Sequence, residues 1–306
     1  MQEDLKQTQH VTVLLQEAVD YLNPQPGKVY VDATLGGAGH TRALLTQQPE
    51  CTVIGLDWDK SVIDTTGQAL KEEFGDRFIP MYGNFSKIYE LIARAGFSKV
   101  DGILADFGTS QIQIHNTPGF SVYKDTFLDM RFSPGMYQMT AYDVVNKFSQ
   151  KDLADIFFEF AQETRSRKIA EMIVNRRKIK RFKTTIDLAE SIKKMTPGSY
   201  HKIHPATKVF QALRIFINQE LQNIQAFLAN AGQVLNPEGR LVCISFHSLE
   251  DRLVKQFFKD KSRPGSGPFY FELLTKRACV ASPEEVARNR SSRSARLRAA
   301  ILKNFI

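Results

Sequence analysis

The chain has few cysteines and no long apolar run. Only three cysteines occur among 306 residues, and Cys51, Cys243 and Cys279 stand far apart, without the short spacings of zinc ligands. We therefore expect neither a disulfide framework nor a metal site. No apolar stretch approaches the ~20 residues of a membrane span, and the polar, partly acidic first ten residues do not resemble a signal or transit peptide. A cytoplasmic protein without membrane contact is the expectation.

The standard phosphate-binding fingerprints are also missing, although a glycine-rich bend is present. The strand-like run "VYVD" (29–32) is followed by three glycines within the four positions 36–39, namely Gly36, Gly37 and Gly39. The spacing G-x-G-x-x-G fails because Arg42 stands at its last position, and no G-K-[S/T] follows. This disfavours a dinucleotide and hence a nicotinamide-dependent dehydrogenase. Glycine also occurs in ordinary tight turns, so the bend alone does not identify a ligand.

Positive charge is in excess and is clustered. Lysine plus arginine outnumber aspartate plus glutamate by 41 to 33, which gives a net charge of +8. Residues 165–183 hold nine basic side chains and one acidic, and residues 276–303 hold eight and two. Two such stretches favour a partner with a phosphate backbone, although two solvated helix faces are the alternative. The arginines that we single out as candidate nucleic-acid contacts are Arg176, Arg177, Arg293 and Arg296.

Strand-like and helix-like segments alternate along most of the chain, which is typical of an α/β fold with a doubly wound parallel sheet. The predicted strands cover residues 28–32, 52–57, 77–82, 100–106 and 240–246, with 271–276 and 294–303 as added edge strands. The predicted helices cover residues 10–22, 40–48, 61–74, 86–96, 149–178, 184–195, 206–235 and 248–260. Because no buried strand is predicted between residues 109 and 205, we expect residues 1–108 and 206–306 to form a Rossmann-like domain. Residues 109–205 would then be a mainly helical insertion that recognises the substrate.

Three of the predicted strands end in aspartate, at Asp32, Asp57 and Asp106. The carboxyl ends of parallel strands meet at one edge of the sheet, where ligands bind. Asp57, at the end of the second strand, is placed to accept hydrogen bonds from both ribose hydroxyls of an adenosine. Such an acidic rim repels phosphate and suits a ligand with an amino group, so it predicts S-adenosylmethionine. Each aspartate taken alone is also explained as a cap or turn residue.

Several motifs follow one another in a recognisable order over nearly the whole chain. They include "DATLGGAGHT" (32–41), "DGILADFGTSQIQI" (101–114), "HPATKVFQALRIFIN" (204–218), "SFHSLEDRLVKQFF" (245–258) and "NRSSRSARLR" (289–298). In this order they resemble the ribosomal RNA small-subunit methyltransferase H family, also called MraW. The resemblance implies a class I methyltransferase fold and S-adenosylmethionine as cofactor. It implies methylation at N4 of a cytidine in the decoding centre of 16S rRNA, with the rRNA or the assembling small subunit as partner.

The resemblance also suggests roles for individual residues. Ala38, Gly39 and His40 would line the cofactor together with Gly36, Gly37 and Asp32 of the bend. Asp57 would bind the ribose and Phe85 would lie beside the adenine. Asp106 and Gln113 would lie near the methionine end or the reaction centre, and His247, after the fifth strand, would contact the RNA or the target base. The predicted catalytic residues are thus Asp106, Gln113 and His247. Arg131 is a candidate phosphate clamp, and Phe120, Tyr123 and Phe132 are candidates to receive the base.

The chain departs from the family pattern at a few positions. Ala38 replaces a usual glycine, so the loop must either avoid a positive φ there or tolerate strain. Phe107, Thr109 and Gln111 are substituted in the loop after the fourth strand, and Pro118 stands where the family has arginine. These departures leave an alternative function open, a non-catalytic RNA-binding or ribosome-assembly factor that kept the fold. Retention of Asp32, Asp57, Asp106 and Gln113 favours the enzyme.

Overall fold

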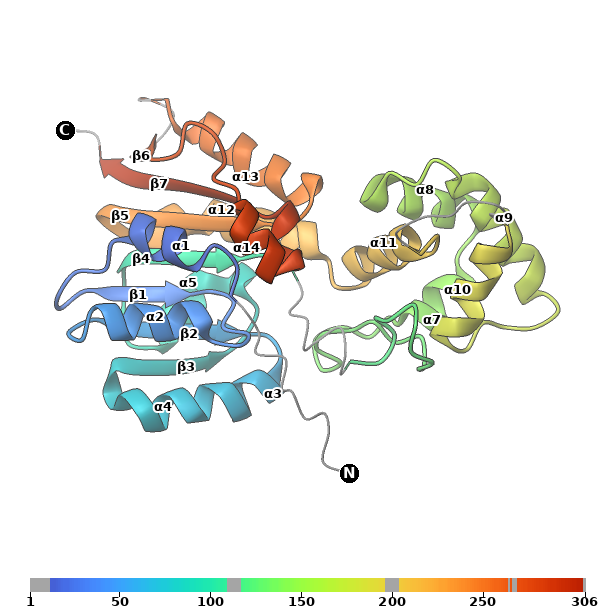
Figure 1. Ribbon diagram of the computed structural model, residues 1–306, viewed down its shortest axis with the longest axis horizontal. Coiled ribbons are helices and arrows are strands. Elements are labelled where there is room, and N and C mark those ends of the chain that lie inside the picture. The colour runs from blue at the N-terminus through green and yellow to red at the C-terminus, as the bar shows by residue number, and fades with distance from the viewer. Residues whose placement is uncertain (1–11, 109–116, 196–203, 264, 266–268, 305–306) are drawn as a thin grey trace. The chain divides into compact units, whose positions relative to one another are not determined.

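The computed structural model describes residues 12–108, 117–195, 204–263, 265 and 269–304. The chain divides into two compact units, which are seen in Figure 1. Unit 1 comprises residues 1–110 and 221–306, and unit 2 comprises residues 111–220. The predicted insertion ended at residue 205, whereas unit 2 also contains helix α11 (Thr207–Ile217), which packs against helices of that unit.

Unit 1 is built on a mixed sheet in the strand order β3-β2-β1-β4-β5-β7-β6. Strands β1 to β5 are parallel to one another, and β7 runs antiparallel between β5 and β6. This confirms the predicted α/β class. The segment expected as an edge strand at 294–303 lies inside the sheet, because β6 covers its outer side. The strands are β1 Val29–Asp32, β2 Thr52–Asp57, β3 Phe78–Tyr82, β4 Val100–Asp106, β5 Leu235–Ser245, β6 Phe269–Leu273 and β7 Arg296–Asn304.

Helices cover both faces of this sheet (Figure 1). One core cluster joins the strands to α1, α2 and α4, and the other joins them to α5, α12 and α13. The strands are nearly continuous apolar runs because both of their faces are buried. The helices of unit 1 are α1 Leu15–Leu22, α2 Gly39–Gln47, α3 Lys60–Val62, α4 Gln68–Phe74, α5 Ile88–Arg94, α12 Glu220–Val234, α13 Ser248–Lys261 and α14 Pro283–Arg288. A π-helical turn, Ile63–Gly67, joins α3 to α4. No helix among the described residues is long and apolar enough to span a bilayer.

Helix α1 starts later than predicted. It begins at Leu15, because Leu14 adopts a left-handed conformation with φ of 50° and donates its N–H to Glu285 Oε1 at 2.9 Å. Helix α13 begins at Ser248, as predicted, and has its N-cap at His247. Its third residue, Glu250, accepts the N–H of His247 at 3.3 Å and that of Phe246 at 2.8 Å.

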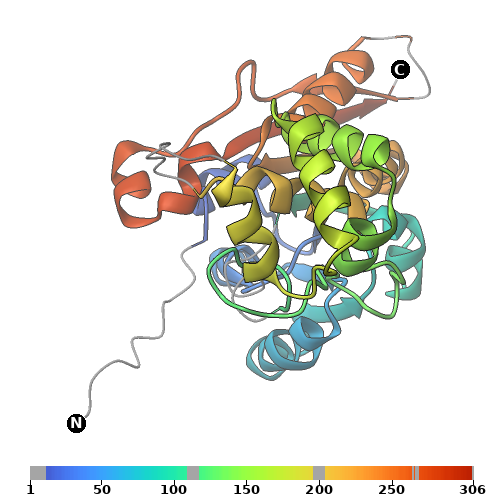
Figure 2. The ribbon, with the colours of Figure 1, turned by 90° about the vertical axis from the view of Figure 1, so that its right-hand side faces the viewer.

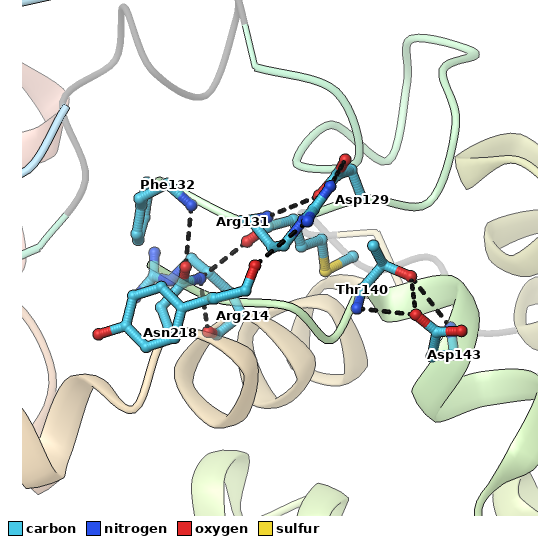
Figure 3. Close-up of polar contacts among 9 residues, drawn as sticks. Asp129, Arg131, Phe132, Thr140, Asp143, Arg214 and Asn218 are labelled. Atoms are coloured by element: carbon cyan, nitrogen blue, oxygen red, sulfur yellow. Dashed lines mark hydrogen bonds and ion pairs between the residues drawn. The ribbon is translucent and has the colours of Figure 1, made fainter. Parts of the chain in front are cut away.

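Unit 2 is helical, as expected, and its helices are seen in green to gold in Figure 2. They are α7 Ala141–Lys147, α8 Gln150–Ala161, α9 Ser166–Arg177, α10 Thr185–Lys194 and α11. The prediction of one helix over residues 149–178 was wrong, because Gln162 adopts a positive φ of 50° and separates α8 from α9. Helix α7 was not predicted. Its start is stabilised by a capping box in which Thr140 and Asp143 bond each other's backbone N–H (Figure 3).

The predicted long helix over residues 206–235 is likewise two helices, α11 and α12. Gln219 breaks it with φ of 51°. The fully buried Asn218 side chain accepts the N–H of Phe132 at 2.9 Å and donates to the Met130 carbonyl at 2.8 Å, as Figure 3 shows. It also donates to the Arg214 carbonyl at 2.9 Å in the last turn of α11. The asparagine therefore fastens the loop 130–132 to the end of α11.

We expect Asn218→Ala to lower the free energy of unfolding by about 3 kcal/mol, because the N–H of Phe132 and the carbonyl of Met130 lose their partner, at about 1–3 kcal/mol each. Urea titration followed by circular dichroism measures this. Asn175→Ala, which truncates an exposed asparagine of α9 in the same unit, is the matched control. Equal stability of the two variants would show that the loop does not depend on Asn218.

Candidate active site

The register of the sheet brings three carboxyl groups to one edge. Asp32 lies opposite Gly55 of β2 and opposite Leu104 of β4. Asp57 and Asp106 each stand two residues further along these neighbouring strands, so they flank the bend that leaves β1. The strand order reverses between β1 and β4, which is where open parallel sheets bind ligands. The structure therefore assembles the predicted acidic rim within unit 1.

Asp57 joins the loops that follow β1 and β2. One carboxylate oxygen accepts the N–H of Gly36 at 2.9 Å, and the other accepts the N–H of Asp59 at 2.9 Å. Each oxygen keeps a second lone pair for another donor. Burial raises the pKa of Asp57 to about 7, and the carboxylates of Asp59 and Asp32 add to this rise.

Asp32 faces inward and shapes the same bend. Its carboxylate accepts the Thr41 hydroxyl at 2.7 Å and the Thr34 N–H at 3.2 Å. Burial raises the pKa of Asp32, and the hydrogen bond from Thr41 opposes this rise. Both carboxylate oxygens thus hold the loop, and direct contact of Asp32 with a ligand stays a prediction.

Asp106 is the least satisfied of the three carboxyl groups. Its N–H donates to the Thr34 hydroxyl at 2.8 Å, which fixes the end of β4 to the loop after β1. Within the described part of the chain, its buried Oδ1 atom has no hydrogen-bond partner. Burial raises the pKa of Asp106 well above its ordinary value, and the nearby carboxyls of Asp32 and Glu250 raise it further. An unpartnered carboxyl oxygen at this edge is a ready acceptor for a ligand N–H.

The bend itself adopts a strained and tightly packed conformation. Ala38 has φ of 62° and is buried, so the loop tolerates a left-handed alanine rather than avoiding it. A left-handed residue that carries a Cβ costs about 1–2 kcal/mol. Tertiary contacts hold the bend in place, because His40 Nε2 lies 3.1 Å from the Val13 carbonyl. A Cβ on Gly39 would lie 1.7 Å from Thr12 Oγ1, so only glycine fits beneath the segment 12–14.

Phe85 belongs to an aromatic cluster rather than standing free. The centroid of its ring lies 5.7 Å from the ring centroids of both Phe107 and Phe227, and 6.0 Å from that of Trp58. Phe85 is 9% exposed, whereas Trp58 is half-buried. Phe107, one of the departures from the family pattern, is buried and packs edge-on against Phe227. The substitution therefore fills the core behind Phe85.

The carboxyl end of β5 adds His247 and a buried glutamate. His247 Nε2 lies 3.1 Å from Glu250 Oε1, and the Glu250 side chain is fully buried. Arg296, at the start of β7, pairs with Ser245 at the end of β5, so this exposed arginine lies at the same edge of the sheet as the three aspartates. Arg293 is exposed in the preceding 3₁₀ turn. Arg298, two residues beyond Arg296 in β7, instead pairs with Asp251 of α13 at 2.7 Å.

The candidate RNA-binding arginines of unit 2 have partners within that unit. Arg131 forms a two-pronged ion pair with Asp129, at 2.6 and 2.9 Å, and also donates to the Tyr137 carbonyl (Figure 3). Arg176 pairs with Asp187 and lies over the ring of Phe182, 4.2 Å from its centroid. Their contact with RNA stays a prediction.

Arg177 also has its partners within unit 2, because it donates to the carbonyls of Val145 and Phe148 at 2.7 and 2.5 Å.

The aromatic residues proposed to receive the base differ in exposure. Phe120 and Phe132 pack against each other with ring centroids 4.9 Å apart and are nearly buried, whereas Tyr123 is exposed.

Some predicted residues lie outside the described part of the chain, and some observed ones were not predicted. Gln113 belongs to the first group, together with the departures Thr109 and Gln111. Thr34, Thr41 and Trp58 belong to the second, although each directly neighbours a predicted residue or motif. Glu250 is also in this group, and its place three residues after His247 is the signal that could have found it.

The chemistry of the edge fits S-adenosylmethionine. The bend presents glycine backbone at 36, 37 and 39, Asp57 keeps lone pairs for ribose hydroxyls, and Asp106 Oδ1 is an unused acceptor. Trp58 directly follows the end of β2, and Phe85 stands three positions beyond the end of β3, so both supply aromatic surface at this edge. Adenine stacks well on such surface.

Comparison with known proteins identifies relatives of this chain that are named as methyltransferases. The MraW methylase family matches residues 7–303. A protein of Carboxydothermus hydrogenoformans named ribosomal RNA small subunit methyltransferase H is 44% identical over 97% of this chain and 98% of its own length. Proteins of the same name from Nitrobacter hamburgensis and Thermomicrobium roseum are 45% and 43% identical, over 95% and 97% of this chain and 90% and 95% of their own lengths.

This match covers both units and nearly the whole sequence, and it includes every candidate residue of the acidic rim and the glycine bend. It confirms the predicted methyltransferase and its cofactor, S-adenosylmethionine. The chain belongs to the MraW methylase family.

Proposed function

We propose that this protein methylates N4 of a cytidine in the decoding centre of small-subunit rRNA. The observation that carries the proposal is the edge of the sheet where Asp57 and Asp106 flank a glycine-rich bend, with Asp106 Oδ1 unpartnered among the described residues. The names of the relatives, all small-subunit rRNA methyltransferases, support rRNA as the substrate. The net charge of +8 and the exposed Arg293 and Arg296 beside the rim agree with a polyanionic partner.

Orientation is the main task of the protein in this reaction. When bound, S-adenosylmethionine supplies a methyl group activated by a positively charged sulfur. The N4 lone pair of cytosine is delocalised into the ring, so the amine must be held in line with that methyl group and shielded from water. Fixed orientation contributes up to ~7–11 kcal/mol in favourable cases. Asp57 and the bend fix the donor, and Asp106 Oδ1 accepts an N4 hydrogen and so aims the nitrogen.

Asp106 is also suited to take up the proton that N4 releases as the new C–N bond forms and the bond between the methyl group and the sulfur breaks. Burial beside two other carboxyls raises its pKa, which makes its ionised form a stronger base than an ordinary carboxylate. A cationic donor beside it favours that ionised form. His247 stands at the neighbouring strand end and is proposed to contact the base or the RNA. The target base leaves its stack to reach this edge, at a cost of a few kcal/mol.

We expect Asp106→Asn to lower kcat by about 10²- to 10⁴-fold, the usual effect of losing a positioned base. Its affinity for S-adenosylmethionine should fall by a smaller factor, because asparagine keeps the shape of the side chain but no longer attracts the cationic donor. The assay follows tritiated methyl transfer to small subunits from a strain that lacks this modification, with digestion to nucleosides to locate the label. Asp64→Asn removes an exposed carboxylate and is the control. Label absent from cytidine with the wild-type protein would instead favour a non-catalytic RNA-binding factor.

Gly39→Ala is expected to weaken cofactor binding by about 10- to 100-fold, because the new Cβ overlaps Thr12 and overpacking costs about 1–3 kcal/mol. Calorimetric titration with S-adenosylmethionine measures the affinity. The double variant Gly39→Ala with Thr12→Gly removes the overlap and should recover most of it. If both variants bind as tightly as the wild type, the bend does not contact the donor.

Cofactor affinity should rise with pH, with a midpoint near 7. The pKa of Asp57 in the free protein is raised to about 7, so below this pH the group is a neutral acid and above it a carboxylate. Only the carboxylate accepts hydrogen bonds from both ribose hydroxyls and attracts a cation. Titrations between pH 5.5 and about 8.5 test this. Asp57→Asn should bind weakly at every pH, and an unchanged pH profile in that variant would assign the dependence to another group.

A further inference from the structure

A basic turn links α9 to α10 in unit 2. Residues 178–183 carry four cations and no acidic side chain. Lys178, Lys180, Arg181 and Lys183 are all exposed. None of these four forms an ion pair with a carboxylate of the described residues; Lys178 makes one long hydrogen bond, 3.5 Å to Asn175 Oδ1. By contrast, exposed lysines elsewhere in this unit, such as Lys147 and Lys151, pair with aspartates on their own helices.

The turn is held in place from both sides. The ring of Phe182 is fully buried. The side chain of Asn146 in α7 accepts the N–H of Phe182 at 3.0 Å and donates to the Phe182 carbonyl at 2.8 Å. The Lys183 carbonyl accepts the N–H of Leu128 at 3.1 Å. A backbone anchored in this way presents its charges in a fixed arrangement, so less entropy is lost when a partner binds.

The two arginines before the turn serve this anchoring. Arg177 bonds the last carbonyls at the end of α7, and Arg176 covers the ring of Phe182 and neutralises Asp187, the acidic residue nearest to the turn. Both arginines belong to the basic stretch 165–183, but their side chains already bind partners inside unit 2. The charges left for a partner are the four that follow them.

We propose that the turn 178–183 binds the phosphate backbone of the substrate rRNA. The inference rests on the proposed function, because it takes the polyanion to be the rRNA that is methylated. Four unpaired cations on a fixed backbone match a chain of phosphates, whose binding releases counterions and is therefore dependent on salt. Contacts of this kind position the RNA and carry no sequence information.

The test replaces the four cations with glutamine, as Lys178→Gln, Lys180→Gln, Arg181→Gln and Lys183→Gln together. Fluorescence anisotropy measures the binding of this fourfold variant to labelled small-subunit rRNA over a range of potassium chloride concentrations. The slope of log K against log salt should become shallower by about 2 to 4, since each lost phosphate contact removes about 0.7–0.9. KM for the RNA should rise, while kcat at saturating RNA and the affinity for S-adenosylmethionine should stay unchanged.

A matched control removes the same charge from lysines that are already paired. It combines Lys60→Gln, Lys71→Gln, Lys87→Gln and Lys151→Gln, whose partners are nearby carboxylates. Ile179→Ala, at an exposed apolar side chain within the turn, controls for shape without changing charge. The single exposed reversal Lys180→Glu provides the same test if the fourfold variant melts at a lower temperature than the wild type.

The outcomes are distinguishable. If the fourfold turn variant has the same salt slope as the matched control while the wild type binds and methylates rRNA, the inference is overturned and the proposed function stands. If the wild type neither binds nor methylates rRNA, both are overturned. A shallower slope in the turn variant alone supports the inference.

Discussion

The bend after β1 depends on one buried carboxylate. Asp57 accepts an N–H from Gly36 with one oxygen and from Asp59 with the other, and so joins the loops that leave two adjacent strands. The energetic consequence is a carboxyl group with a pKa raised to about 7, because burial disfavours its charge more than two hydrogen bonds favour it. The same group therefore shapes the bend, and its contact with the cofactor stays a prediction.

The strain in the bend is balanced by contacts from a distant part of the chain. Ala38 keeps a left-handed conformation although alanine disfavours it, and its N–H donates to the Leu35 carbonyl at 2.7 Å while its carbonyl accepts the N–H of Arg42 at 2.9 Å. His40 is fastened to the Val13 carbonyl, and Thr12 lies against Gly39. The segment before α1 is in turn held by Glu285 of α14. The shape of the site thus rests on residues from both ends of the chain.

Basic residues divide into two classes that composition cannot separate. One class forms contacts inside unit 2: Arg131 and Arg176 form ion pairs, Arg176 also covers an aromatic ring, and Arg177 donates to carbonyl groups. The exposed cations of the turn 178–183 form no ion pair with a carboxylate in the part of the chain that the structure describes. Arginine suits the first task because its planar fork satisfies several acceptors at once. A count of positive charge in a stretch therefore overestimates the part of it that is available to nucleic acid.

The sequence by itself determined the parallel strands, the three aspartates at their ends and the glycine bend, because alternating apolar runs and local turn residues specify these features over short distances. It also indicated a helical second unit and, through its motifs, the family. The break between α11 and α12, the left-handed Ala38, the partners of the arginines and the raised pKa values of Asp57 and Asp106 were decided only by the tertiary structure. Each of these depends on groups far apart in the sequence, such as Asn218 with Met130 or Gly36 with Asp57. A local pattern cannot specify a contact whose second partner lies elsewhere in the chain.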